Sequence, residues 1–418
     1  MQKIWEALGI CPADIMVPQE RCDLKKWSVV ACDQFTSDAD YWGQTEEFVG
    51  DAPSALRVTF PEIYLNDRPA ERIGKINHTI RQYMNEGVFR EYKNAIFFVR
   101  RTLHSGAVRR GLVLAADLEH YDYAKGSQSL IRATEGTILD RLPPRMRIRE
   151  NAPMEFPHIM VLIDDPDQTV IEPLGFQEQA RVYRTELMQN GGKIEGYLLS
   201  DAQQETVAKA LLALADPAAA AKKYGVSQDT PVLLYAVGDG NHSLATAKAC
   251  WERIKETLSP QERETHPARY ALIELVNLHD DSLVFEPIHR IITGADVQQL
   301  LSCLKCAQGG QEITVLYGGE RHSMRLSPTH ELAVGTLQAA LDEYLAAHPE
   351  ASVDYVHEAE TVARLSAQEG NVGFLLPPMG KNQLFRSVML NGVLPRKTFS
   401  MGEGCDKRYY LEGRRIVK

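Results

Sequence analysis

The sequence predicts a mixed α/β (α+β) fold that is divided into two or three domains or subdomains. Strand-like apolar runs alternate with amphipathic helical runs along the whole chain, a pattern typical of sheets covered by helices. The chain has 418 residues, which is more than one ordinary hydrophobic core accommodates. A composition of 44% hydrophobic and 24% charged residues is ordinary for a soluble globular protein.

Residues 1–150 are the first predicted region, an N-terminal α/β region. Apolar extended stretches alternate here with a long amphipathic stretch. The expected elements are extended runs over Trp27–Cys32 and Ala55–Leu65, a helix over Ala70–Asn85, and strands over Ala95–Arg100 and Leu112–Ala116.

Residues 151–293 are the predicted central region. Asn190-Gly191-Gly192 lies between two alternating runs, which indicates a β-hairpin. The expected elements are a strand over Phe156–Ile163, the hairpin over Arg181–Leu199, a helix over Ala215–Lys223, a strand over Val232–Val237, a helix over Leu244–Ile254 and a strand over Tyr270–Leu278.

Residues 294–376 are predicted to form a small α/β subdomain. Residues 377–418 are a C-terminal segment that we expect to return to the main body as a strand or ribbon. The elements expected in the subdomain are helices over Val297–Cys306, Leu337–Ala347 and Thr361–Ala367, a hairpin of Ile313–Leu316 with Met324–Leu326, and strands over Val353–His357 and Gly373–Leu376.

The most informative motif is a glycine-rich turn between the strand at 232–237 and the helix at 244–254. It reads Gly238-Asp239-Gly240-Asn241-His242-Ser243. Glycines allow a sharp turn and close approach of a ligand, and a helix start presents N–H groups and the positive end of its dipole to an anion. The candidate phosphate-binding residues are therefore Gly238, Gly240, Asn241 and Ser243. Asp239 and His242 are candidate catalytic residues, and Asp239 is also a candidate metal ligand.

The same turn has a second interpretation that involves no ligand. A plain strand-to-helix turn, capped by Asn241 or Ser243, would have the same composition. The motif is not a Walker A loop, because no Lys-Ser/Thr follows, and it lacks the third glycine of a Rossmann fingerprint. The residues by themselves leave both interpretations open.

A second polar segment combines a cation, hydroxyls and a carboxylate. Arg132 and Thr134 suit phosphate oxygens, and Glu135 would accept a substrate proton as a catalytic group. The alternative is a capping box from Thr134 to Thr137 at the start of a helix, with exposed charges.

Four further segments supply the remaining candidates. Asp281 follows an apolar strand, where α/β proteins often place functional groups, and is a candidate metal ligand. Arg290, Arg396 and Lys397 are candidate phosphate clamps, and Asp33 is a candidate catalytic residue that would orient the acceptor. A polar turn, a helix cap or a solvated basic face would explain each of these segments without any function.

The seven cysteines are scattered and odd in number, so they do not indicate a disulfide framework. Cys303 and Cys306 form a CxxC pair without a second pair or a nearby histidine. We expect the two to share a helix face in a structural role, with a metal or redox site as the alternative.

Charge and hydropathy restrict the class of partner. The net charge of −10 gives the chain no general electrostatic affinity for nucleic acid. Residues 1–10 do not read as a signal peptide, and no apolar stretch approaches the roughly 18 residues of a membrane span. We expect a cytoplasmic protein that binds a small-molecule substrate and a nucleotide, without a membrane partner; a homo-oligomer stays open.

Four segments of the chain resemble a bacterial family known as domain of unknown function 1015. They are Trp27–Ser37, Gly238–Ala247, Phe374–Met379 and Leu394–Met401. These segments are spread over nearly the whole chain. The resemblance therefore identifies a family, although it names no function.

The glycine turn also resembles the Asp-Gly-His/Asn-His-Arg turn of the ParB and sulfiredoxin superfamily. The matching residues are Asp239, Gly240, Asn241 and His242. This resemblance implies a ParB/sulfiredoxin-like mixed-sheet core and nucleotide binding at the turn, because members bind nucleotides there and one branch phosphorylates free serine. Ser243 stands at the superfamily's arginine position, so that phosphate ligand is missing here or is supplied by Arg132, Arg290 or Arg396.

Three hypotheses about function follow. The first is a nucleotide- and Mg²⁺-dependent phosphotransferase that uses ATP or ADP and acts on a small hydroxylated metabolite, with free serine as the best guess. The second is a nucleotide-binding regulatory protein without turnover, which Ser243 in place of the arginine favours. The third is a ParB-like nuclease, which the acidic net charge disfavours.

Overall fold

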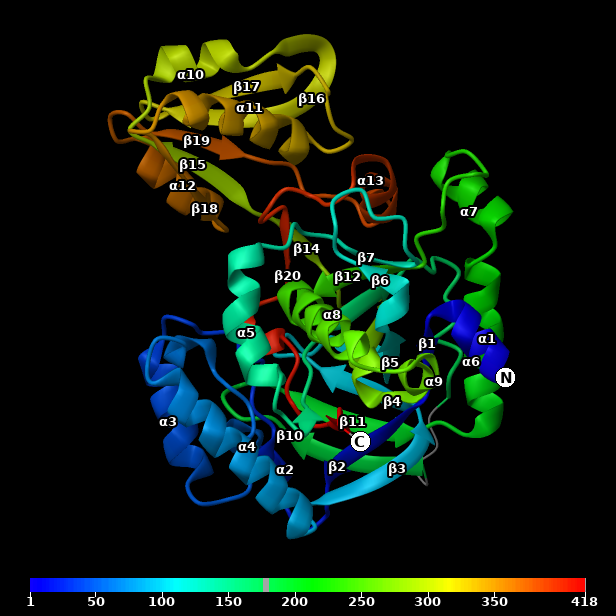
Figure 1. The fold of residues 1–418 in the computed structure, drawn as a ribbon. Helices are drawn as coiled ribbons and strands as arrows, with labels where there is room; N and C mark the ends of the chain where they lie inside the picture. The colour runs from blue at the N-terminus through cyan, green and yellow to red at the C-terminus, as the bar shows by residue number, and fades with distance from the viewer. Residues whose placement is uncertain (176–179, 418) are drawn as a thin grey trace. The chain divides into compact units, whose positions relative to one another are not determined.

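A computed structural model describes residues 1–175 and 180–417, and the chain forms two compact units (Figure 1). Unit 1 comprises Met1–Ala133, Thr137–Leu283 and Glu403–Lys418, and unit 2 comprises Thr134–Gly136 and Val284–Gly402. Lys418, the last residue of the predicted C-terminal segment, lies outside the described residues.

The two units divide the chain differently from the predicted domains. The predicted regions 1–150 and 151–293 share unit 1, because strands from both pair in one sheet. The change to unit 2 comes after Leu283, before the predicted boundary at 293. The predicted segment 377–418 is divided as well, since its residues from Glu403 onward belong to unit 1 and the earlier ones to unit 2.

In unit 1, the residues that the structure describes form a ten-stranded mixed sheet. The strands lie in the order β10 (Arg181–Glu186), β11 (Lys193–Leu198), β4 (Phe97–Thr102), β5 (Val108–Asp117), β13 (Tyr270–Asn277), β9 (Met160–Ile163), β12 (Tyr235–Asp239), β7 (Ile131–Ala133) and β6 (Tyr121–Asp122), with β1 (Ile10–Cys11) added to β5. The pairs β13/β9, β12/β7 and β7/β6 are parallel, and the other neighbours are antiparallel. Two ribbons accompany the sheet: β2 (Ala13–Pro18) with β3 (Phe89–Ala95), and β8 (Met154–Glu155) with β21 (Arg414–Arg415).

Helices surround this sheet in unit 1 (Figure 1). They are α1 (Gln2–Leu8), α2 (Leu24–Trp27), α3 (Ala39–Val49), α4 (Pro69–Asn85), α5 (Leu142–Arg149), α6 (Asp201–Leu214), α7 (Pro217–Tyr224), α8 (Asn241–Glu256) and α9 (Pro260–Thr265). Helices α5 and α8 pack against each other. In the described part of the chain, no helix combines the length and the apolar character that crossing a bilayer requires.

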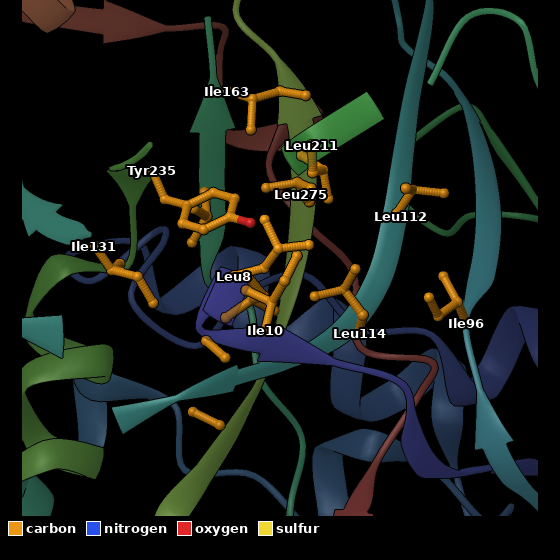
Figure 2. Close-up of a cluster of buried hydrophobic side chains, with 14 of the residues drawn as sticks. Leu8, Ile10, Ile96, Leu112, Leu114, Ile131, Ile163, Leu211, Tyr235 and Leu275 are labelled. Carbon is orange, nitrogen blue, oxygen red and sulfur yellow. The ribbon is translucent and has the colours of Figure 1, made fainter. Parts of the chain in front are cut away.

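The sheet of unit 1 lies between two hydrophobic clusters, because successive side chains of a strand point to opposite faces. On β4, Phe98 belongs to one cluster and Phe97 to the other. Figure 2 shows part of the first cluster, where Leu8 from α1 and Leu211 from α6 lie with strand residues such as Leu275. This double burial explains the long apolar strand runs in the sequence.

Unit 2 is smaller and also mixes helices with strands. Among its described residues, a five-stranded antiparallel sheet has the order β17 (Glu320–Leu326), β16 (Cys306–Tyr317), β19 (Val372–Leu375), β15 (His289–Thr293) and β18 (Ser352–Val356). The strands β14 (Phe285–Pro287) and β20 (Phe399–Met401) form a separate ribbon. The helices are α10 (Val297–Cys303), α11 (Ala333–Ala347), α12 (Ala359–Ser366) and α13 (Gln383–Asn391).

The mixed α/β class is confirmed, whereas some predicted elements are wrong. The run 55–65, predicted to be extended, forms two short 3-10 turns, because its apolar side chains pack on the core without pairing to a strand. Trp27 ends a helix instead of starting a strand. The helix predicted through Cys306 ends at Cys303 and Cys306 begins β16, so the two exposed thiols do not share a helix face.

Candidate functional site at the start of helix α8

The glycine turn connects β12 to α8, and its backbone conformation depends on Gly240. This residue is the N-cap of α8 and has φ 76°, in the left-handed region. A Cβ atom at this position would lie 3.0 Å from Cα of Ile159, which is too close for a relaxed contact. The prediction that Asn241 or Ser243 caps the helix is therefore wrong: a residue without a side chain occupies the N-cap, and Asn241 is already helical.

Asp239 brings a carboxylate to the same helix end. Its Oδ1 accepts a hydrogen bond from the Gly240 N–H at 3.0 Å, and its Oδ2 lies 3.2 Å from Nζ of Lys407. Lys407 comes from the C-terminal segment 403–418, far from the turn in the sequence. The carboxylate of Asp239 and the ammonium of Lys407 thus lie side by side next to the first turn of α8.

His158 is the centre of a buried polar cluster beside this turn. Its Nε2 lies 3.1 Å from Oγ of Ser243 and 3.3 Å from Oδ2 of Asp33. Its Nδ1 lies 2.8 Å from the hydroxyl of Tyr410, which also accepts a hydrogen bond from the Cys32 N–H at 3.0 Å. Four segments that are remote in the sequence therefore meet at one imidazole.

Backbone pairing explains why these segments meet. The Ala31 N–H donates to the carbonyl of Arg408 at 2.9 Å, and the Tyr410 N–H donates to the carbonyl of Val29 at 2.8 Å. The C-terminal segment is thereby fixed alongside the segment that carries Asp33. Both Lys407 and Tyr410 are delivered to the cluster by this pairing.

The charges in the cluster stabilise one another. Burial lowers the pKa of His158, but the charge and hydrogen bond of Asp33, together with the contact with Cys32, outweigh this effect and hold the pKa well above its usual value. Burial raises the pKa of Asp33, yet the charge and hydrogen bond of His158 dominate and hold it well below its usual value. Both pKa shifts favour the charged forms, so His158 and Asp33 form an imidazolium–carboxylate pair.

This arrangement differs from a Ser-His-Asp nucleophilic triad. In a triad the carboxylate and the serine bond opposite nitrogens of the imidazole. Here Asp33 and Ser243 both approach Nε2, and Tyr410 occupies Nδ1. A protonated imidazole donates from both nitrogens, so His158 supplies positive charge to the helix start instead of activating Ser243 as a nucleophile.

A cavity of about 160 Å³ opens beside the cluster in unit 1. Cys32, His158, Ser243 and Tyr410 line one part of it. The remaining lining comes from α4, α5, the segment before α4 and the residues around Ile159, and most of it is apolar. The site thus joins a charged helix start to an apolar chamber.

The remaining residues of the turn also have identified contacts. Asn241 is buried and its Nδ2 donates to the Val237 carbonyl at 3.3 Å. Nε2 of His242 accepts a hydrogen bond from the Ile138 N–H at 3.3 Å. Gly238 lies within β12, where the register with β9 shifts. The structure therefore places all the sequence-predicted turn residues together, with Asp33 added to them.

Arg132 has a structural explanation in unit 1. Its buried guanidinium donates to the Ser129 carbonyl at 2.8 Å and to the Pro231 carbonyl at 2.9 Å. These contacts fix the loop before β7 to the segment before β12. These contacts account for the buried arginine without a phosphate.

Thr134 and Glu135 belong to unit 2, together with the predicted clamp residues near the C-terminus. The Thr134 carbonyl accepts from the Leu394 N–H at 2.7 Å, and Oε1 of Glu135 accepts from the Lys397 N–H at 3.2 Å. The alternative of a capping box at 134–137 is wrong, because the segment pairs with residue 394 and the next helix, α5, begins only at residue 142.

Arg290 is fully buried in unit 2, and protein acceptors surround its guanidinium. Nε donates to Gln338 at 3.1 Å, and the two terminal nitrogens donate to the carbonyls of Lys397 at 2.8 Å and Arg396 at 2.9 Å. Its prediction as a phosphate clamp is corrected to a role in fixing the 396–397 loop. Arg396 itself lies over the ring of Tyr355, 5.6 Å from the centroid.

Asp281 does not share a metal site with Asp239. Strand register places Asp239 opposite Met160, at the beginning of β9, whereas the end of β13 at Asn277 is opposite Ile163, at the other end of β9. Asp281 follows β13 and is exposed, so the two carboxylates lie toward opposite ends of the sheet. Within residues 1–175 and 180–417, no group of three His, Cys, Asp or Glu side chains is arranged to hold a metal ion.

Sequence reasoning missed His158. It identified Lys407–Tyr410 as a locally basic stretch suited to clamp phosphates, with a solvated basic face or a partly buried strand as the alternatives, but did not assign it to the glycine turn. The local signal for His158 is a single polar residue in the apolar run Phe156–Ile163, which is usually explained by a satisfied core histidine. The basic stretch around Lys407 is visible in the sequence, but nothing local connects it to the glycine turn. Long-range pairing makes these residues part of the site.

Several solved structures are similar to the chain at low sequence identity. A free serine kinase in complex with AMP has 9% identity and a TM-score of 0.37, over 71% of this chain and 93% of that chain. A mutant of a free serine kinase in complex with ADP has 9% identity and a TM-score of 0.38, over 71% and 92%. A conserved hypothetical protein from Pyrococcus furiosus has 11% identity and a TM-score of 0.35, over 69% and 94%.

Family membership is decided by the sequence itself. No curated protein matches the chain. The family model described as protein of unknown function (DUF1015) matches residues 15–344, which is well over half of the chain and includes the glycine turn. The family resemblance seen in the sequence is thereby confirmed. This chain is a member of the DUF1015 family of proteins of unknown function.

Proposed function

We propose that unit 1 binds the phosphates of a nucleotide at the start of α8 and transfers a phosphoryl group to a hydroxyl of a small molecule. One observation supports this most strongly: a helix that begins at a glycine lies beside two cations, His158 and Lys407, and two carboxylates, Asp33 and Asp239. Phosphoryl transfer depends mainly on positioning and charge neutralisation, and these groups provide both.

The binding half of the proposal rests on the electrostatics of α8. The helix has 16 residues, so its dipole places a partial positive charge at the first turn. Gly240 allows the turn its left-handed φ and lets Ile159 pack against the N-cap, and the backbone N–H groups of the first turn are the groups that would bind the anion. Imidazolium His158 and Lys407 add positive charge beside the same turn.

The catalytic half rests on the two carboxylates. Mg²⁺ in phosphate sites usually takes one or two carboxylates together with the phosphate oxygens, and Asp33 and Asp239, which reach the start of α8 through His158 and Gly240, would be these carboxylates. When bound, the ion would neutralise phosphate charge. Because its pKa is lowered, Asp33 stays ionised and is suited to orient the hydroxyl of the acceptor by accepting its hydrogen bond. Ser243 would contact a phosphate oxygen, and Asn241 and His242 would position the turn.

Nucleotide binding is the first test. Thermal unfolding of the full chain is followed with AMP, ADP and ATP, each with and without Mg²⁺, the nucleotides being chosen to include those in the solved kinase structures. A ligand at about 100 times its dissociation constant adds roughly 2.7 kcal/mol of stability. We expect stabilisation by at least one nucleotide. No stabilisation by any of them would refute the proposal.

A matched pair of lysine variants locates the binding. Lys407→Met removes the cation at the start of α8, whereas Lys255→Met removes a cation near the other end of the same helix, where Lys255 pairs with Glu119 and Glu252. We expect weaker nucleotide binding only in Lys407→Met. Equal effects of both variants would place the nucleotide elsewhere.

A second function is favoured by one observation. Asp33 and Asp239 each face a cation already, and these pairs would have to rearrange before either carboxylate could serve Mg²⁺ or an acceptor. A regulatory protein that binds a nucleotide without turnover needs no such rearrangement. Phosphorus NMR of the protein with Mg²⁺, ATP or ADP and a panel of hydroxyl compounds that includes free serine separates the two: a phosphorylated product supports transfer, and saturable binding without product supports regulation.

A further inference from the structure

We propose that the cavity beside His158 binds a ring-sized apolar group of the acceptor, so that the acceptor is an aryl-alkyl alcohol and not free serine. The acceptor role rests on the proposed phosphotransfer. The cavity itself is defined by the geometry of unit 1 alone.

The size and the walls of the cavity favour an apolar ring. Its volume is about 160 Å³. An apolar cavity of about 150 Å³ in a protein core stays dry and takes up benzene, so a ring of this size fits. Phe60, Ile80, Ile148, Phe156 and Ile159 contribute apolar walls from four places in the chain.

The charged residues in the wall are already paired. Nη2 of Arg145 lies 2.5 Å from Oε1 of Glu62, and Nη2 of Arg149 lies 2.6 Å from Oε2 of Glu155. Free serine carries an ammonium and a carboxylate close to its hydroxyl. In this cavity those charges would lose water and meet either apolar walls or arginines and glutamates that are already paired, which is costly.

The polar end of the cavity lies at the start of α8. Ser243 and Thr246, from the first two turns of the helix, line the cavity together with His158, Cys32 and Tyr410. An alcohol whose ring fills the apolar part therefore directs its hydroxyl, on a short carbon arm, toward the turn that is proposed to hold the phosphates. Benzyl alcohol and 2-phenylethanol have this shape.

The chemical step balances with these groups. A bond forms between the alcohol oxygen and the terminal phosphorus of ATP or ADP, and the bond from that phosphorus to the bridging oxygen breaks, its electron pair leaving with the nucleotide. The hydroxyl proton passes to the carboxylate of Asp33, which then returns it to water. The products are a phosphate monoester and the shortened nucleotide.

A nucleobase is a less suitable occupant of the cavity. Its ring edges carry donors and acceptors that would face apolar side chains, and each unsatisfied polar group costs about 1–3 kcal/mol. The charged side chains of the wall are engaged with one another, Arg145 with Glu62 and Arg149 with Glu155, so a base would have to compete with these pairs for partners. The experiment therefore treats base binding as an outcome that would overturn the inference.

The thiol of Cys32 provides a local readout of cavity occupancy. Cys32 lines the cavity, whereas Cys303 and Cys306 are exposed and belong to unit 2. The full chain is treated with N-ethylmaleimide in the presence of benzyl alcohol, 2-phenylethanol, glycerol, free serine or ATP, and labelling of each cysteine is followed by peptide mass spectrometry. We expect the two aryl alcohols to slow labelling of Cys32 alone.

Filling the cavity supplies the matched variants. Ala152→Leu adds bulk to a buried residue of the wall, and Ala220→Leu makes the same change at a buried residue of α7, outside the cavity. We expect Ala152→Leu to weaken protection by benzyl alcohol about tenfold or more, because the added side chain occupies the space of the ring. Ile148→Phe fills the same cavity from α5 and serves if Ala152→Leu does not fold.

The outcomes distinguish the two proposals. Protection of Cys32 by aryl alcohols but not by serine or glycerol, together with formation of an aryl-alkyl phosphate, supports the inference. Protection by serine alone, or loss of ATP binding in Ala152→Leu without loss in Ala220→Leu, overturns it. Protection by benzyl alcohol in a protein that binds no nucleotide supports the ring site and overturns the proposed phosphotransfer.

Discussion

Replacing Asp33 by asparagine tests the ion pair at the centre of the candidate site. The substitution keeps the shape of the side chain but removes the negative charge that faces Nε2 of His158 at 3.3 Å. The His158 side chain is buried, whereas 27% of the Asp33 side chain is exposed. The loss is therefore smaller than the roughly 3–5 kcal/mol of a fully buried pair, and we expect the free energy of unfolding to fall by about 1–3 kcal/mol.

The pH dependence of this loss follows from the raised pKa of His158. The unfolded chain releases the imidazole proton near its ordinary value of 6.5, whereas the folded protein keeps it to higher pH. The stabilisation is therefore complete below that value and is lost as pH rises through the folded pKa, at up to about 1.4 kcal/mol per pH unit. In Asp33→Asn, burial favours the neutral imidazole, so we expect this slope to disappear.

Urea unfolding followed by tryptophan fluorescence measures this difference in unit 1, because all four tryptophans lie there. Wild type, Asp33→Asn and the exposed control Asp281→Asn are compared from about pH 5.5 to about pH 9. We expect the difference between wild type and Asp33→Asn to be largest at the acidic end and to shrink with rising pH, while Asp281→Asn follows wild type. A difference that stays constant over this range would refute the ion-pair reasoning.

Three further predictions concern the stability of unit 1, each measured by the same unfolding assay. Gly240→Ala should destabilise unit 1 by about 1–3 kcal/mol, because alanine is strained at φ 76° and its Cβ contacts Ile159. The control Gly43→Ala lies inside α3, where a Cβ meets nothing, and should stabilise by up to about 1 kcal/mol. Stabilisation by both substitutions would contradict this prediction. Tyr410→Phe should cost about 1–3 kcal/mol, since it removes the hydroxyl that contacts the Cys32 N–H and His158, and an unchanged midpoint would show that water replaces it. Arg408→Met should lower the free energy of unfolding by about 3–5 kcal/mol, because the buried carboxylates of Glu274 and Glu412 lose their shared cation. The control Arg253→Met breaks an exposed pair and should cost under about 1 kcal/mol. Similar losses in both variants would disprove the burial argument.

Local features of the chain could be predicted where neighbouring residues decide the structure. The hairpin at 181–199 follows from a Gly-Gly turn between alternating runs, and β10 and β11 pair there as expected. Helix α4 likewise appears over Pro69–Asn85, close to the predicted 70–85. The glycine turn was recognised before α8 for the same reason, since a strand, two glycines and an amphipathic run are contiguous in the sequence.

Elements whose conformation depends on distant partners were predicted poorly. The run 55–65 has the apolar content of a strand, but a strand also needs a neighbour to pair with, and the core offers only a surface to pack against. The separation of Asp239 from Asp281 depends in the same way on the register of β12 and β13 against β9. Neither pairing leaves a local trace in the sequence.

The sequence by itself determined the mixed α/β class, the family and the position of the glycine turn between β12 and α8. Tertiary structure decided what stands around that helix start. His158, Asp33, Lys407 and Tyr410 reach it from three separate segments, because residues 29–31 pair with residues 408–410 and strand β9 follows His158 directly into the sheet. The hydrophobic periodicity that predicts helices and strands depends on neighbours along the chain. The cluster around His158 depends on contacts between segments that lie far apart in the sequence, and no local pattern encodes how those segments pair.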